Sequence, residues 1–267
     1  MSLQKRFGQN FLVSRVHLMK VVEAASPDES DTILEIGPGA GALTVELAQR
    51  AGKVVAVELD RNLLPLLAEV LAPFENVALI QADALKLDLS SLGATKVVAN
   101  IPYNITSPLL IAFLRCRPAF QSITLMVQKE VAHRLAALPG TPDYGSLTVF
   151  VGYYARVALV ADVPRGAFLP PPRVDSAVIH LTPHSLPPVE VPSEEALFAV
   201  SRAAFGQRRK TVGNALSHGL GRPRGEIDEV LHLAAIDPQH RGETLSLAEF
   251  ARISRYLFDK DNYQEIE

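Results

Sequence analysis

Residues 32–41 read TILEIGPGAG, and this stretch decides the fold. Its first five residues are mostly apolar or β-branched, which is typical of a buried strand. The glycines that follow allow a tight turn and a close approach to a ligand, and a helix is predicted over residues 42–50. A second strand over residues 53–57 runs into Glu58, 21 residues after Gly37. Strand, glycine turn, helix, strand and acid predict a nucleotide-binding βαβ unit in which the acid binds ribose hydroxyls.

The glycine pattern fits two classes of cofactor. Gly37, Gly39 and Ala42 satisfy the G-x-G-x-x-A form of dinucleotide-binding proteins. Glu35 with Gly37, Gly39 and Gly41 satisfies the E-x-G-x-G-x-G form that is typical of enzymes using S-adenosylmethionine. The glycine turn by itself therefore leaves open a nucleotide-dependent oxidoreductase and a methyltransferase.

Two later strands also end in polar residues. A strand predicted over residues 77–80 is followed by Asp83 and Ala84, and the next, over residues 97–99, runs into residues 100–103. The acid at position 83 can accept a hydrogen bond from an adenine amine. Open α/β sheets bind ligands outside the carboxyl ends of their strands. We therefore expect these polar residues and the glycine turn to surround one site.

Residues 100–103, Asn-Ile-Pro-Tyr, combine two acceptors with an aromatic ring. Pro102 favours an extended Ile101, which fixes the direction of the Ile101 carbonyl beside the Asn100 amide oxygen. Two such acceptors can hold both N–H groups of an exocyclic amine and aim its lone pair at an electrophile. The ring of Tyr103 can stack on the base. A strand-end turn with a packed tyrosine is the plainer interpretation of this tetrapeptide, and the neighbouring strand ends favour the functional one.

The alternation of strands and helices continues to residue 181. Further strands are predicted over residues 122–127, 149–154, 155–163 and 177–181, with helices over 106–115 and 129–138. Phe168 precedes a run of three prolines, which can present its ring rather than bury it.

A change of pattern divides the chain into two domains. Residues 183–192 contain four prolines and form a linker. We predict an α/β domain over residues 1–184 and a helical domain over residues 185–267. Its helices are expected over residues 194–205, 207–220, 225–235 and 246–258.

Composition restricts the class of protein. The chain has 267 residues, of which 48% are hydrophobic and 21% charged, as in a globular protein. No run approaches the roughly 18 apolar residues of a membrane span, and no signal-type apolar core follows the basic N-terminus. The single cysteine, Cys116, excludes an intrachain disulfide and a cysteine-rich zinc site. We expect a cytoplasmic, monomeric protein without a metal.

Positive charge is segregated although the net charge is −3. Residues 1–22 and 202–224 contain no acid, and neither does the stretch between Asp88 and Glu130. Such segregation suggests a polyanion-binding face on a mildly acidic protein. The basic residues are Lys5, Arg6, Arg15 and Lys20 near the N-terminus and Arg202, Arg208, Arg209, Lys210, Arg222 and Arg224 near the C-terminus.

Eight motifs between residue 4 and about residue 255 resemble, in order, those of the KsgA-type ribosomal RNA adenine N6-dimethyltransferases. The motifs are GQNFL, EIGPGAGALT, VELD, ADAL, NIPYNITSPLL, MVQKEVAHRL, FLPPPRVDSA and FGQRRKTVGNAL. The resemblance implies a Rossmann-like, seven-strand methyltransferase sheet with a small helical C-terminal domain. It also implies S-adenosyl-L-methionine as the methyl donor and S-adenosyl-L-homocysteine as the product.

The implied substrate is small-subunit (16S) ribosomal RNA in the 30S subunit or its precursor, with two adjacent adenosines near the 3′ end each dimethylated at N6. The resemblance places Asn10, Leu12, Gly37, Gly39, Glu58, Asp83, Ala84 and Asn100 at the cofactor. It assigns the target amine to Asn100 and the Ile101 carbonyl, and the target base to Tyr103 and Phe168. Phosphate contacts are expected from Lys5, Arg6, Arg208, Arg209 and Lys210.

Three alternatives stay open at this point. Macrolide-resistance methyltransferases, which act on large-subunit RNA, share the fold and the main motifs, although KEVAHRL and FGQRRKTVGNAL are closer to the small-subunit enzymes. A nucleotide-dependent oxidoreductase explains the glycine turn but not residues 100–103. A non-catalytic assembly factor would not need an intact cofactor loop.

Overall fold

The computed structural model describes residues 10–116, 120–207 and 209–258. The described chain divides into two compact units. One unit contains the chain through His133 together with Ala155–Pro183, and the other contains Arg134–Tyr154 and the chain from His184 onward. Residues 134–154, predicted in the α/β domain, group with the helical unit.

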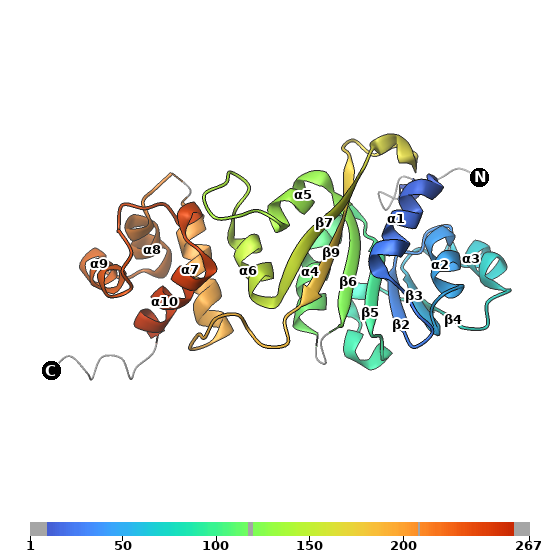
Figure 1. Cartoon of the computed structure of the whole chain (residues 1–267), viewed down its shortest axis with the longest axis horizontal. Coiled ribbons are helices and arrows are strands. Elements are labelled where there is room, and N and C mark those ends of the chain that lie inside the picture. The colour runs from blue at the N-terminus through green and yellow to red at the C-terminus, as the bar shows by residue number, and fades with distance from the viewer. Residues whose placement is uncertain (1–9, 117–119, 208, 259–267) are drawn as a thin grey trace. The chain divides into compact units, whose positions relative to one another are not determined.

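The first unit is built on a seven-stranded sheet with the order β4-β3-β2-β5-β6-β9-β7 (Figure 1). Strand β2 pairs in parallel with β3 and β5, so that Leu34 lies between Val55 and Val97. Strand β9 runs antiparallel to both β6 and β7. The seven strands are β2 (Thr32–Ile36), β3 (Lys53–Glu58), β4 (Val77–Gln81), β5 (Lys96–Asn100), β6 (Ser122–Gln128), β7 (Ala155–Val163) and β9 (Ser176–Pro183). The predicted seven-strand α/β sheet is confirmed.

Helices α1 (Arg15–Ala25) and α2 (Ala42–Ala48) cover part of this sheet. Each presents an apolar stripe, represented by Val21, Val22 and Leu47, to buried strand residues such as Ile33 and Met126. The unit also contains α3 (Leu64–Leu71), α4 (Thr106–Arg115), most of α5 (Lys129–Leu135) and an antiparallel pair of two-residue strands, β1 (Phe11–Leu12) and β8 (Phe168–Leu169). Its short turns are η2 (Ala84–Lys86), η3 (Leu89–Leu92), η4 (Tyr103–Ile105) and η5 (Arg165–Ala167).

The strand order reverses between β2 and β5, because the chain passes from β2 through β3 to β4 on one side and then returns to β5 on the other. Ligands of open α/β sheets bind at such a switch point, outside the carboxyl ends of the strands. The glycine turn after β2 and the Asn-Ile-Pro-Tyr segment that β5 leads into both lie there.

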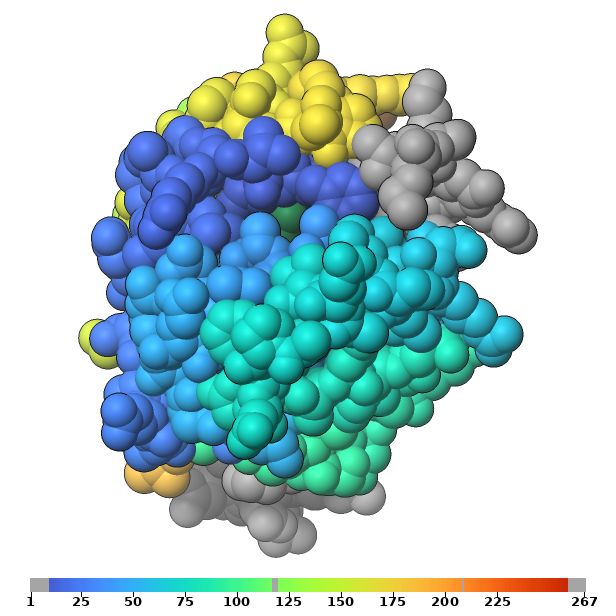
Figure 2. Space-filling view, turned by 90° about the vertical axis from the view of Figure 1, so that its right-hand side faces the viewer, coloured from blue at the N-terminus to red at the C-terminus, as the bar shows by residue number. Residues whose placement is uncertain are grey.

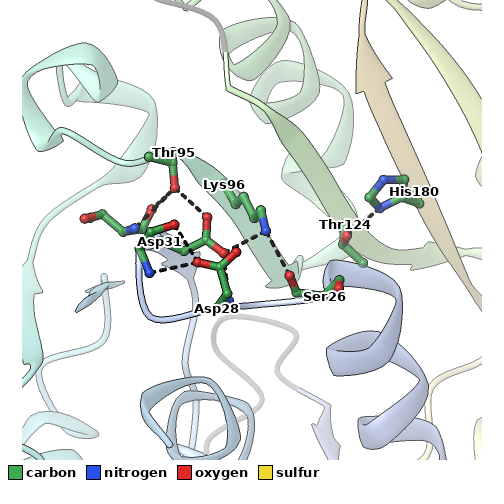
Figure 3. A network of polar contacts seen from close by, with 9 residues as sticks. Ser26, Asp28, Asp31, Thr95, Lys96, Thr124 and His180 are labelled. Atoms are coloured by element: carbon green, nitrogen blue, oxygen red, sulfur yellow. Dashed lines mark hydrogen bonds and ion pairs between the residues drawn. The ribbon is translucent and has the colours of Figure 1, made fainter. Parts of the chain in front are cut away.

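The opposite, amino end of the same strands is held by a polar network (Figure 3). The ammonium group of Lys96 donates to the carboxylate of Asp31 at 2.7 Å and to the carbonyl of Ser26 at 2.8 Å. The hydroxyl of Thr95 donates to the second oxygen of Asp31 at 3.1 Å. Because Lys96 begins β5 and Asp31 precedes β2, the network fixes the ends of two adjacent strands.

The second unit is helical, with α6 (Ser146–Tyr154), α7 (Glu194–Gly206), α8 (Val212–Leu220), α9 (Arg224–Leu233) and α10 (Leu247–Phe258). Ser193 caps α7 by accepting a hydrogen bond from the Ala196 amide at 3.1 Å. The predicted capping box also forms, because Ser246 and Glu249 exchange hydrogen bonds at the start of α10.

Two local predictions in this part of the chain are wrong. Residues 149–154, predicted as a strand, belong to helix α6, where the rings of Phe150 and Tyr154 pack against Phe198. The helix expected from residue 207 begins only at Val212, since Gln207 ends α7 with φ −130° and the Lys210 amide bonds back to its carbonyl. Arg209 and Lys210 therefore lie exposed in a turn, not on a helix.

The described residues contain no helix that is both long and apolar enough to cross a membrane. Within the same ranges, no cluster of three or more His, Cys, Asp or Glu side chains could hold a metal ion. The thiol of Cys116, the single cysteine of the chain, is buried.

Candidate active site

A cavity of about 500 Å³ opens at the switch point of the sheet. Figure 2 shows a recess on this side of the molecule, between the blue N-terminal segments and the light-blue and teal segments that follow. The predicted residues brought together around the cavity are Asn10, Leu12, Gly37, Gly39, Glu58, Asp83, Ala84, Asn100, Ile101 and Tyr103. Of the residues predicted for the cofactor and the target base, Phe168 alone is not among the lining residues.

The glycine turn has the backbone geometry that glycine favours. Gly37, Gly39 and Gly41 have φ values of 69°, 62° and 85°, which side-chain-bearing residues rarely adopt. A Cβ atom on Gly39 would also lie 3.1 Å from the ring of Phe11, which lines the same cavity. Gly41 then forms the N-cap of α2. The turn thus brings bare backbone to the cavity wall, as the spacing of the glycines predicts.

Glu58 ends β3 and is almost completely buried. Its carboxylate accepts hydrogen bonds from the Asp60 amide at 2.8 Å and from the Gly39 amide at 3.4 Å. Burial raises the pKa of Glu58 above its usual value, and these two amides oppose that rise. The hydrogen bonds fix the carboxyl group beside the glycine turn.

Asp83 lies at the end of the next strand and is half-buried. One carboxylate oxygen accepts a hydrogen bond from the Leu85 amide at 3.1 Å and thereby caps η2. The other lies 3.7 Å from the ammonium group of the exposed Lys86. The capping bond orients Asp83 while its backbone neighbours Ala82 and Ala84 form the adjoining wall.

Asn100 and Ile101 are positioned by two backbone contacts. The side-chain amide nitrogen of Asn100 donates to the Asn10 carbonyl at 3.4 Å, which leaves the Oδ1 atom as the acceptor. The amide of Ile101 donates to the Met126 carbonyl at 3.2 Å, so β6 continues to hold the chain after β5 has ended. An amide oxygen and a backbone carbonyl therefore follow each other at the cavity.

Tyr103 lies in η4 and is anchored by its hydroxyl group, which is 2.6 Å from the hydroxyl of Ser176 on β9. Burial raises the pKa of the Tyr103 phenol, which keeps it neutral. The anchor holds the ring at the cavity beside Asn100 and Ile101.

The expected presentation of Phe168 is not observed, since its side chain is 3% exposed and belongs to the main hydrophobic core. The cause is the pairing of β8 with β1, in which Phe168 lies opposite Leu12. Alternate side chains of a strand point to opposite faces, so Leu169 is the one that is exposed, at 56%.

Glu35 belongs to the glycine motif, but its place in the sequence predicts no specific function for it. Its side chain is 1% exposed, lines the cavity, and has an Oε2 atom without a hydrogen-bond partner among the described residues. Burial raises the pKa of Glu35 to about 8, and the nearby Glu58 adds to the rise. The sequence does contain a signal for a function of Glu35. An acidic residue within an otherwise apolar strand is costly to bury, and such a residue is therefore a candidate for a functional role.

The charges of the cavity fit S-adenosylmethionine better than a dinucleotide. Three carboxyl groups line it, from Glu35, Glu58 and Asp83, and no Lys, Arg or His among the described residues does. A dinucleotide brings a doubly negative pyrophosphate, for which the described lining offers no cationic side chain. S-adenosylmethionine brings a sulfonium and an ammonium group, and the orphaned oxygen of Glu35 offers a partner for a cation.

The predicted RNA-contacting residues are only partly within the described chain. Arg209 and Lys210 are exposed, whereas Lys5, Arg6 and Arg208 lie outside the described residues. Arg222 and Arg224 are paired with Glu226 and Asp228, the first acids beyond the basic stretch.

Comparison with known proteins finds relatives that match nearly the whole chain. The family model described as "Ribosomal RNA adenine dimethylase" matches residues 1–259. The chain is 49% identical to "Ribosomal RNA small subunit methyltransferase A" of Geobacillus thermodenitrificans over 96% of its own length and 91% of the relative's. A protein of the same name from Moorella thermoacetica is also 49% identical, over 95% of this chain and 92% of that one.

Two solved structures share most of the fold. A dimethyladenosine transferase from Plasmodium falciparum has a TM-score of 0.81 at 28% identity, covering 91% of this chain and 95% of its own. The 23S rRNA methyltransferase ErmE has a TM-score of 0.72 at 28% identity, covering 93% and 99%. The family match over nearly the whole chain excludes the oxidoreductase interpretation, and the chain belongs to the ribosomal RNA adenine dimethylase family.

Proposed function

We propose that this enzyme transfers methyl groups from S-adenosylmethionine to the N6 amines of two adjacent adenosines near the 3′ end of small-subunit ribosomal RNA. The observation that carries the proposal is that the paired acceptors of Asn100 and Ile101 line the same cavity as Glu58 and Asp83. On this proposal, the cofactor site and the site for an exocyclic amine adjoin. The relatives named for the small subunit favour that substrate over the large subunit.

Each of the acidic residues at the cavity would bind a different part of the cofactor. Glu58, fixed by the Gly39 and Asp60 amides, would hold the ribose hydroxyls, and Asp83 would accept from the adenine amine. Glu35 would face the cationic half of the cofactor. The bound cofactor supplies a methyl group activated by its positively charged sulfur.

The target adenine would be held by the segment that follows β5. Asn100 Oδ1 and the Ile101 carbonyl each accept one N–H of the amine, which frees the nitrogen lone pair from the ring and directs it at the methyl group. The anchored ring of Tyr103 stacks on the base. The nitrogen gains a methyl group and loses a proton to water, so positioning supplies the rate and the chain needs no general base. Four transfers per RNA require room beside Asn100 for a methylated amine.

The enzyme is proposed to act on the 30S subunit or its precursor as a monomer. The test is to incubate it with unmethylated 30S subunits and labelled cofactor and to map methylated adenosines by mass. Two adjacent dimethylated adenosines near the 3′ end of the small-subunit RNA are expected. Label confined to large-subunit RNA, or absent, would overturn the proposal.

The same assay tests the amine site. Asn100→Ala should reduce transfer at least a hundredfold, since it removes one of two acceptors that act together, while the protein stays folded. The matched control is Asn62→Ala, which removes an exposed asparagine amide bonded only to Asp60 within the same unit. A rate for Asn100→Ala within a few-fold of the control would exclude Asn100 from the mechanism.

A further inference from the structure

The helical unit contains a second recess, of about 340 Å³, between α7 and α8. Its polar lining comes from Arg202 on α7, Gln207 just after α7, and His218 on α8. No acid lines it, and the rest of its wall is small or apolar. Those residues are Ala199, Ala203, Gly206, Ala215, Gly219 and Leu220.

Small residues create the recess. A Cβ atom on Gly219 would lie 2.7 Å from the Cβ of Ala203, so the two helices approach each other too closely there for any larger residue. Arg202 and His218, the neighbours of this contact in the sequence, are both exposed at its edge. The contact therefore places the guanidinium of Arg202 and the imidazole of His218 at the same recess.

In the part of the chain that the structure describes, no acid pairs with the cations at this recess. Arg222 and Arg224 donate to Glu226 and Asp228 at 2.6 and 2.8 Å. By contrast, Arg202 makes no ion pair with any residue in the described ranges, and neither do the exposed Arg209 and Lys210, which follow Gln207. Among the described residues of the basic stretch, these cations without an acidic partner lie in the last turns of α7 and just after it, beside the recess.

We infer that this recess binds one unpaired nucleotide of the ribosomal RNA, with Arg202 on its phosphate and His218 against its base. The inference rests on the proposed RNA substrate and adds a second RNA site, in the helical unit. A guanidinium forms strong, charge-assisted bonds to phosphate. A histidine ring can stack on an unpaired base, and the amide of Gln207 can donate to and accept from a base edge. The volume lies at the small end of ligand pockets, which suits a single nucleotide and not a duplex.

The experiment measures binding of the full-length enzyme to unmethylated small subunits across a salt series. Arg202→Gln should weaken binding about tenfold at low salt, the effect of losing one charge-assisted hydrogen bond. It should also reduce the magnitude of the slope of log affinity against log salt by about 0.7–0.9, as for one lost phosphate contact. The matched control, Arg222→Gln, removes the same charge from the same unit, but this guanidinium is already paired with Glu226. It should bind within about twofold of wild type.

A second variant tests the ring. His218→Ala should weaken binding about tenfold, as expected when one base loses its aromatic partner, and should leave the salt slope closer to wild type than Arg202→Gln does. Because both side chains are exposed, the melting temperatures should stay within a few degrees of wild type. If both variants bind like Arg222→Gln, the recess binds no nucleotide.

The occupant is identified by repeating the series with protein-free small-subunit RNA. Equal losses with RNA and with subunits support a nucleotide, whereas a loss confined to whole subunits would assign the recess to an acidic segment of a ribosomal protein and overturn the inference. Wild-type methylation is measured in parallel. If wild type methylates no adenosine, the proposed function fails; if it does while the variants match the control, only the recess assignment fails.

Discussion

At the scale of single residues, Glu35 carries a carboxyl group that is almost completely buried. It lies at the cavity with an unpartnered oxygen, and burial raises its pKa to about 8. The protein without ligand therefore holds Glu35 protonated at neutral pH. A cation placed beside it would favour the ionised form, which links cofactor binding to release of a proton.

The raised pKa of Glu35 predicts a specific dependence of stability on pH. Between about pH 4.5 and about pH 8, the folded state retains a proton that the unfolded chain has lost, so the free energy of unfolding falls as pH rises. The slope from this one group is about 1.4 kcal/mol per pH unit within that window. Urea unfolding of wild type and Glu35→Gln at pH 5, 6, 7 and 8 isolates the contribution of Glu35. The contributions of the other titratable groups cancel when the two free energies of unfolding are subtracted. A difference that does not change with pH would mean that Glu35 is ionised in the folded protein.

For Phe168, the position within strand β8 determines that the side chain faces the core and not the solvent. Because its ring is buried in the core, Phe168→Ala should lower the free energy of unfolding by about 3–5 kcal/mol. The matched control is the exposed neighbour Leu169, whose replacement by Ala should cost less than about 1 kcal/mol. Denaturant unfolding of both variants checks this. A small loss of stability combined with a large loss of methyl transfer would support the prediction that Phe168 binds the target base.

At the scale of elements, the amino ends of β2 and β5 are joined by the Asp31–Lys96 pair, whose side chains are 2% and 13% exposed. Lys96→Met leaves the Asp31 carboxylate buried without its cation and should cost about 3–5 kcal/mol. Lys129→Met is the matched control. It breaks a pair of nearly the same length, 2.6 Å to Asp162, whose side chains are 41% and 62% exposed.

The control should cost at most about 1 kcal/mol, since water screens an exposed pair. Chemical denaturation of the two variants compares the loss of a buried Lys–Asp ion pair with the loss of an exposed one. Equal losses would show that the network at the strand ends contributes no more than an ordinary surface ion pair.

Considered as a whole, the molecule separates its cofactor cavity from its free basic residues. The cavity lies in the sheet-containing unit and is lined by carboxyl groups, whereas Arg202, Arg209 and Lys210 lie in the helical unit. We propose that carboxyl groups of the first unit recognise the cofactor and that basic residues of the second recognise the RNA. On this proposal, segregated charge lets a chain with a net charge of −3 bind a polyanion.

Binding of a ligand in the cavity should stabilise the folded protein by mass action. S-adenosylhomocysteine at a hundred times its dissociation constant should add about 2.7 kcal/mol and raise the melting temperature by roughly 5–10 °C. NADH at the same concentration should have no effect, because none of the described lining residues is a cation that could neutralise its pyrophosphate. Glu58→Ala should lose most of the shift, and Glu69→Ala, an exposed acid on α3, should keep it. A shift with NADH alone would contradict the charge argument.

The sheet, the glycine turn and the position of Glu58, Asp83 and Asn100 at one edge can be predicted from the sequence. Strands and turns leave local patterns, and parallel strands must bring their carboxyl ends together. The folded structure is needed to see that residues 149–154 form a helix, that Phe168 faces inward, and that Glu35 has an oxygen without a partner among the described residues. An apolar run such as 149–154 has no periodicity to distinguish helix from strand. The direction of Phe168 depends on which strand pairs with it, and the state of Glu35 on which groups surround it, and both are set by residues distant in the chain.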